Sequence, residues 1–174
     1  MPNTTNWDIE YPNGTTTPSV PAVMQAQAES VEAALNSIAL APLAICTNTG
    51  LQSTGTAGVF TAVRWANLHL QGITHASNDS TFVVSEAGIY QVNSRVAFYN
   101  NAVNVAAQVY VNGVAVVESL EDGTTEGGQG QKLRVMHYLK LQAGDAVHIG
   151  AYANTANIKL TGESTFQMAK IAGF

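Results

Sequence analysis

From residue 43 to the end of the chain, apolar and polar residues alternate with a period of two, and this alternation limits the possible folds more than any other feature. Such a period places every second side chain on one face of a β-strand. One face of the segment 88–99 collects Tyr90, Val92, Val96 and Phe98. The segment 131–141 repeats the pattern with Leu and Val. Residues 43–174 are therefore predicted to be all β.

Turn signals separate these segments at the spacing of a sandwich or barrel. Asn112-Gly113 supplies two residues that accept positive φ angles, which predicts a tight hairpin between strands over 104–111 and 114–120. Residues 142–145, QAGD, predict a second tight turn. The expected architecture is an antiparallel jelly-roll sandwich over residues 43–174.

The segment 19–42 reads as a short helix ahead of the β domain. Pro21 suits a first helical turn and Pro42 ends the helix. Apolar residues recur at intervals of four and three, the seam of a short coiled-coil stalk: Met24, Ala28, Val31, Leu35 and Ile38. The alternative is one helix lying on its own domain. We favour self-association, although a seam this short needs stronger contacts elsewhere.

Residues 1–18 form a polar arm rich in Asn, Thr and Pro, in which Trp7, Ile9 and Tyr11 alternate. Such a segment cannot bury enough apolar surface to fold alone. Alternation suits an extended strand that docks on another protein. We therefore predict that Trp7, Ile9 and Tyr11 anchor the chain to a partner.

Charged residues make up only 11% of the chain, and the net charge is −5. Without Lys/Arg clusters, binding to nucleic acid is not expected. The longest apolar stretch, 38–46, is too short to cross a bilayer, so no membrane insertion is expected. Cys46, the one cysteine, is interpreted as a buried, inert thiol. The first residues lack the basic and apolar regions of a secretion signal.

The residues Phe82, Gly88 and Tyr90 follow the spacing F-x5-G-x-Y. From the residues alone, Gly88 permits a tight entry into a strand and Tyr90 points into the core, where its hydroxyl needs a partner. This element resembles that of C1q/TNF-like domains, as do YVNGVAV (110–116), LQAGDAVHIGAY (141–152) and STFQMAKIAGF (164–174). The resemblance implies a ten-stranded jelly roll, a compact homotrimer and no catalytic activity.

A threefold contact is also expected because the apolar positions exceed what one small sandwich can bury. We expect this contact to use apolar residues of the inner sheet, with Tyr152, Phe166 and Met168 as candidates.

The first 35 residues carry a second resemblance, to the start of tailed-phage virion proteins of actinobacterial hosts. It implies a non-enzymatic structural protein of the virion: a head fibre, a capsid decoration or a minor tail protein. The arm would hold it to the particle, and the β head would stabilise the particle or bind a glycan or protein of the host surface. A free C1q/TNF-like ligand-binding module and a glycan-active enzyme on the same fold are the alternatives.

The segment 118–132 gathers acidic residues beside glycines, and its carboxylates could hold Ca²⁺: Glu118, Glu121, Asp122 and Glu126. Their spacing is not that of an EF-hand, so a solvated loop is the favoured interpretation. No G-x-S-x-G element or Gly-rich phosphate loop is present in the sequence. No cofactor is expected.

Overall fold

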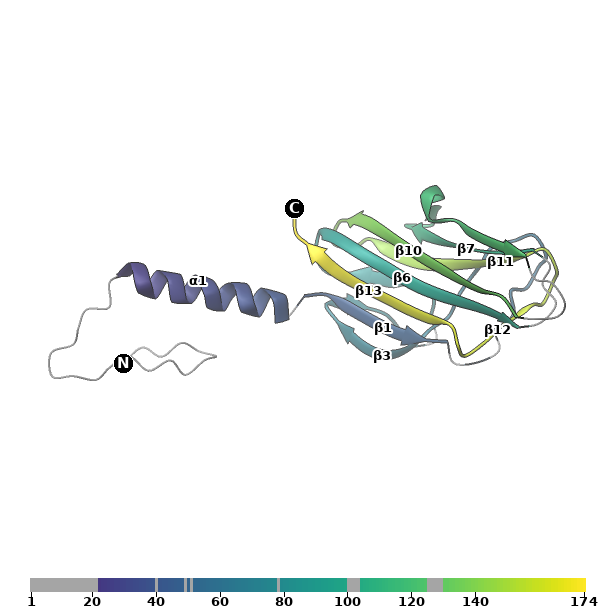
Figure 1. Ribbon diagram of the computed structural model, residues 1–174, viewed down its shortest axis with the longest axis horizontal. Helices are drawn as coiled ribbons and strands as arrows, with labels where there is room; N and C mark the ends of the chain where they lie inside the picture. Colours follow the sequence, from purple (N-terminus) through teal and green to yellow (C-terminus); the bar gives the residue numbers. More distant parts are fainter. Residues whose placement is uncertain are drawn as a thin grey trace. The chain divides into compact units, whose positions relative to one another are not determined.

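The chain divides into two compact units, Met1–Leu40 and Ala41–Phe174 (Figure 1). The computed structural model describes residues 22–39, 41–48, 50, 52–77, 79–99, 104–124 and 130–174. The predicted anchoring residues Trp7, Ile9 and Tyr11 lie outside this range, as does Glu126.

In the first unit, residues Ala22–Ala39 form helix α1, which begins and ends close to the predicted limits. Of the predicted seam, Met24, Val31 and Leu35 are exposed and Ala28 is partly exposed. The structure does not describe the side chain of Ile38. No helix in the described part of the chain is both long and apolar enough to span a membrane. The exposed residues of α1 thus present apolar surface without cover within the described chain.

The second unit is a β-sandwich of two antiparallel sheets, as predicted. Its elements are β1 (Leu43–Thr47), β2 (Thr61–Ala62), β3 (Ala66–Gln71), β4 (Ile73–Thr74), β5 (Phe82–Val84), β6 (Gly88–Tyr99), β7 (Asn104–Val111), β8 (Val114–Ala115), the 3-10 helix η1 (Val117–Ser119), β9 (Glu121–Thr124), β10 (Lys132–Leu141), β11 (Ala146–Ala153), β12 (Lys159–Leu160) and β13 (Thr165–Ala172).

The front sheet, nearest the viewer in Figure 1, has the strand order β10-β6-β13-β1-β3, and β12 pairs with β6. The back sheet has the order β4-β5-β11-β7-β8, with β2 paired to β11 and β9 paired to β7. Several neighbouring strands in these orders, such as β1 and β13 or β7 and β11, are far apart in the sequence, as in a jelly roll. Each sheet therefore presents one face to the core and one face outward.

The core lies between the two sheets and is built from alternate residues of every long strand. Aromatic rings connect the sheets, since Phe82 of β5 stacks on Phe166 of β13 with ring centroids 4.1 Å apart. Phe166 and Met168 are 0% exposed. The prediction that these two residues form a trimer interface is therefore wrong. On β13, Phe166 and Met168 point inward, whereas Gln167 and Ala169 lie on the outward face.

Gly88 begins β6, and a close contact explains why a side chain is excluded there. A Cβ atom at this position would lie 2.6 Å from the carbonyl oxygen of Ala172 and 2.6 Å from Cε of Lys170. The Lys170 side chain passes over Gly88 to reach Glu86, with Nζ 2.6 Å from Oε2. The φ angle of Gly88 is not positive. The glycine makes room for a neighbouring strand, rather than providing a special backbone angle.

The hairpin at Asn112-Gly113 forms as predicted, with φ angles of 52° and 79°. The strand expected over 114–120 does not form beyond Ala115. Instead the chain turns through η1, because the Ser119 hydroxyl accepts a hydrogen bond from the backbone N–H of Val109 and donates one to the carbonyl of Val116. This turn brings β9 back alongside the start of β7.

Candidate functional site: an uncharged band and an aromatic groove

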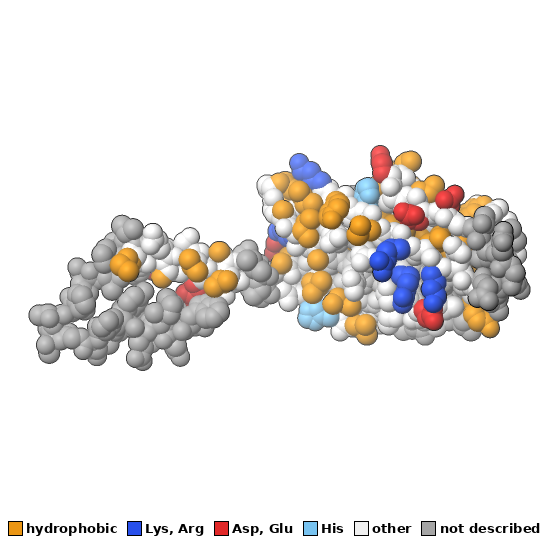
Figure 2. Space-filling model, in the orientation of Figure 1, with side chains coloured by type: hydrophobic (Ala, Val, Ile, Leu, Met, Phe, Trp, Pro, Cys, Tyr) orange, Lys and Arg blue, Asp and Glu red, His pale blue; other side chains and the backbone are white. Residues whose placement is uncertain are grey.

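The outward face of the front sheet carries a band without charged side chains. The pairing places Tyr138, Gln91, Ala169 and Leu43 in one row across β10, β6, β13 and β1, and Met136, Asn93, Gln167 and Ile45 in the next row. We call these eight residues the uncharged band. Met136 and Tyr138 are each 56% exposed. Figure 2 shows hydrophobic side chains gathered on this side of the domain.

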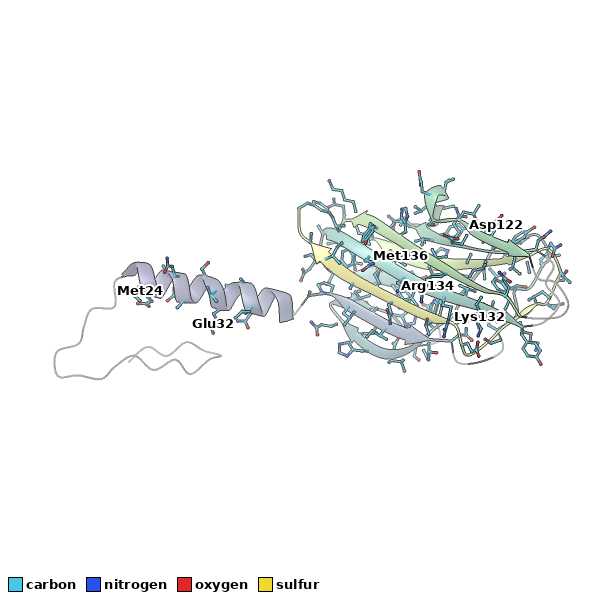
Figure 3. The ribbon with its side chains drawn as sticks, viewed as in Figure 1. Met24, Glu32, Asp122, Lys132, Arg134 and Met136 are labelled. Atoms are coloured by element: carbon cyan, nitrogen blue, oxygen red, sulfur yellow. The ribbon has the colours of Figure 1, made fainter. Side chains whose placement is uncertain are left out.

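Basic residues lie directly beside the uncharged band. Arg134 pairs with Arg95 across β10 and β6 in the next row, and Met136, Arg134 and Lys132 follow one another along β10 (Figure 3). Lys132 forms an ion pair with Glu163 at 2.6 Å, and Arg95 Nε donates to the Glu163 carbonyl at 2.9 Å. The hydrogen bond and positive charge of Lys132 lower the pKa of Glu163. The front face thus has an uncharged part and a basic part.

The outward face of the back sheet contains a groove of about 540 Å³. Three residues define its cross-section, because Tyr152 of β11 pairs with Ala106 of β7 and Ala106 pairs with Asp122 of β9. The small Ala106 forms the floor, with a tyrosine on one side and a carboxylate on the other. The described residues that line it are Phe60, Asn104, Val105, Ala106, Leu120, Asp122, Gly123 and Tyr152.

One wall of the groove is aromatic. The rings of Phe60 and Tyr152 lie 5.4 Å apart and are tilted by 41°. Phe60 also contacts Tyr110 edge-on at 5.9 Å, and Tyr110 stacks on His148 at 4.8 Å. Burial raises the pKa of Tyr110 and lowers the pKa of His148. The four rings form a continuous line beside the groove.

Gly150 allows this line of rings to lie against the sheet. A Cβ atom at Gly150 would lie 2.6 Å from Cε2 of Tyr110 and 3.1 Å from Cδ1 of Phe60. Its neighbour across β7 is Gln108, whose amide donates to the Val116 carbonyl at 3.1 Å. That bond ties the segment before η1 to the sheet, which places Leu120 and Asp122 at the opposite wall.

The predicted acidic loop is only partly described. Glu118, Glu121 and Asp122 are exposed, and Asp122 lines the groove. Among the described residues, no group of three or more His, Cys, Asp or Glu side chains comes together around a potential metal ion. Glu126, the fourth carboxylate of the calcium site considered from the sequence, lies outside the described residues.

Tyr152 lies on the outward face of the back sheet, away from the uncharged band. The proposal that it shares an interface with Phe166 and Met168 is wrong, because the latter two point into the core from the other sheet. Sequence reasoning did not identify Phe60 or Asn104, which are distant from each other in the chain. The alternation on β11 does place Tyr152 on the same face as His148 and Gly150, and the acidic segment 118–132 already singled out Asp122.

Comparison with known proteins defines the fold. No family model matches the sequence, and no curated protein matches it. Among solved structures, murine APRIL at pH 5.0 superimposes with a TM-score of 0.61 at 16% identity, over 75% of this chain and 99% of that chain. A TNF protein, Eiger from S. frugiperda, superimposes with a TM-score of 0.59 at 16% identity, over 77% and 94%.

The β domain has a TNF-like jelly-roll fold. The C1q/TNF-like fold expected from Phe82, Gly88 and Tyr90 is therefore confirmed. At 16% identity the likeness extends to the fold and not to a ligand. In this TNF-like domain the uncharged band and the aromatic groove lie on opposite outward faces, so one can be occupied without blocking the other.

Proposed function

We propose that this protein is a non-enzymatic, self-associating display module: three TNF-like heads held together on a short helical stalk. The observation that carries the proposal is the uncharged band of the front sheet. Interface cores are depleted in charged residues and enriched in Tyr and Met. The band has no charged residue and contains Tyr138 and Met136. The C1q/TNF-like resemblance implies that three copies associate.

Helix α1 supports the same assembly from a separate unit of the chain. Its exposed Met24, Val31 and Leu35 follow the spacing of a coiled-coil seam. A seam this short is too weak to hold an oligomer alone, but it adds to a contact made by the head. The two units thus provide apolar surfaces that association would cover together.

We further propose a virion as the setting, with the arm of residues 1–18 as the anchor. The support is the resemblance of the first 35 residues to virion proteins of tailed phages. Three arms on one trimer would raise the effective local concentration of each anchor. Trp7, Ile9 and Tyr11 would then provide selectivity for a capsid or tail protein. The alternative is a free ligand-binding module, in which the arm contacts no other protein.

The groove gives no support to a glycan-active enzyme. Such enzymes use two carboxyl groups that flank the scissile bond. Among the described residues that line the groove, Asp122 alone carries a carboxylate. The non-enzymatic role is therefore the one we propose.

Sedimentation of the full chain tests the assembly. The wild type should sediment at about 55 kDa, three times the 18.3 kDa of one chain. Met136→Glu should shift the population towards the monomer, because a carboxylate would be buried in the contact. Val114→Glu is the matched control, since Val114 is exposed on the hairpin of the back sheet. A monomeric wild type would overturn the proposal.

Attachment to virus particles that lack the protein tests the proposed virion setting. The full trimer should attach to them, whereas a chain without residues 1–18 should remain a trimer and fail to attach. Attachment by the shortened chain at full occupancy would show that the anchor lies elsewhere.

A further inference from the structure

The groove on the back sheet has an apolar wall and a polar wall, and the space between the two walls is wide enough for a small ligand. Tyr152 and Asp122 lie on strands separated by one strand, which places their backbones about 10 Å apart. Ala106 between them is too small to fill the space. The groove volume of about 540 Å³ falls within the range of small-molecule sites.

The aromatic wall presents carbon surface to this space. Phe60 and Tyr152 are both only partly buried although their rings contact each other at 5.4 Å. Their remaining exposed faces are the apolar component of the site.

Hydrogen-bonding side chains reach the groove from β9, which carries Asp122 in the opposite wall, and from the start of β7, which carries Asn104 next to the floor. Within the described residues, neither the carboxylate of Asp122 nor the side-chain amide of Asn104 has a hydrogen-bond or ionic partner. The backbone N–H of Asn104, in contrast, donates to Asn154 at 3.1 Å. A carboxylate accepts hydrogen bonds and an amide both accepts and donates them, so together they suit hydroxyl groups.

The charge around the groove further limits the chemical class of ligand that can bind there. The segments that form it, residues 50–62, 104–124 and 146–158, contain Glu118, Glu121 and Asp122 but no Lys or Arg. An anionic ligand would therefore be repelled. A quaternary ammonium ion is best held by several rings that surround it. Here the two lining rings are on one side, which leaves the other side for hydroxyl groups.

We propose that this groove binds a neutral saccharide. An apolar face of a sugar ring would lie on Phe60 and Tyr152, and its hydroxyl groups would bond to Asp122 and Asn104. The inference extends the proposed display role to a ligand class. All the residues that this proposal uses lie in one copy of the chain, so binding and trimer formation can fail independently.

Ligand-observed NMR on the full-length protein tests the proposal. The probes are maltotetraose, chitotetraose and mannotetraose, with sialyllactose as an anionic probe and tetramethylammonium as a cationic one. At least one neutral saccharide should bind. Asp122→Asn and Tyr152→Ala should each weaken its binding about tenfold or more, as expected when a hydrogen-bonding or stacking partner is lost.

Matched control variants distinguish a loss of binding in the groove from nonspecific effects of a substitution. Glu118→Gln removes the same charge outside the groove lining, and Tyr99→Ala removes an exposed tyrosine outside it; both should bind normally. Ala106→Phe should fill the groove and abolish binding while Asp122 remains. Thermal melting and sedimentation of each sample establish that it is folded and show its assembly state.

Three outcomes would overturn the proposal: no neutral saccharide binds at millimolar concentration, only sialyllactose or tetramethylammonium binds, or saccharide binding persists in both Asp122→Asn and Tyr152→Ala. A monomeric protein that binds a neutral saccharide in the groove would support this site while contradicting the proposed trimer.

Discussion

The hydroxyl of Tyr90 donates a 2.9 Å hydrogen bond to the carbonyl oxygen of Glu86, and this bond spans the turn that leads into β6. The Tyr90 ring is completely buried. Burial raises the pKa of its hydroxyl to about 12. The same turn is held from outside by the ion pair of Glu86 and Lys170. The turn and the following strand are thus stabilised from both sides.

Replacement of Tyr90 should separate the contribution of the ring from that of the hydroxyl. Tyr90→Phe should lower the free energy of unfolding by about 0.5–1.5 kcal/mol, because one hydrogen bond is lost. Tyr90→Ala should lower it by about 3–5 kcal/mol through the cavity left in the core. Urea unfolding measures both values, with Tyr99→Phe on the surface as the control. Equal stability of Tyr90→Ala and wild type would contradict the position of this ring.

Gly88→Ala should destabilise the domain by about 1–3 kcal/mol, as overpacking does. The added methyl would meet the carbonyl of Ala172, which belongs to the backbone and cannot rotate away. Gly173→Ala is the control, because a Cβ atom there would meet nothing within 4 Å. Thermal melting of the two variants compares them directly. A normal melting temperature for Gly88→Ala would show that β13 can shift to make room for the methyl group without a loss of stability.

Stability should fall as the pH is lowered below 6.5, the ordinary pKa of histidine. Burial lowers the pKa of His75, which stacks on Phe82 at 4.1 Å, and also that of His148. The unfolded chain then binds protons that the folded chain does not. The contribution is fully present above 6.5 and is lost as the pH falls towards the lower folded-state pKa values.

Denaturant unfolding at a series of pH values, with NMR titration of the imidazoles, measures this effect. Stability that rises on acidification through this range would contradict the buried, neutral state of His75 and His148.

The thiol of Cys46 should resist modification in the folded protein. Burial raises its pKa to about 11, and the side chain is 1% exposed. The reactive thiolate is therefore scarce and inaccessible at neutral pH. Reaction with a disulfide reagent should follow the rate of unfolding and become rapid in denaturant. Immediate reaction of the native protein would contradict the burial.

The sequence by itself determined the class of the fold, because alternation and turn chemistry are local. Asn112-Gly113 predicted a hairpin, and both residues have the positive φ angles that it requires. The period of two on β6 correctly placed Tyr90 and Val92 in the core. The helix appeared within a few residues of its predicted ends, since prolines act on their own neighbours.

Only the tertiary structure decided which face each strand turns outward and which residues meet. Alternation identifies two faces of a strand but does not say which one a partner will cover. For this reason Phe166 and Met168 were assigned to an interface, although they fill the core. The groove depends on pairings between distant strands, which bring Tyr152, Ala106 and Asp122 into one row. Long-range register arises from the packing of the whole sandwich, and no short segment encodes it.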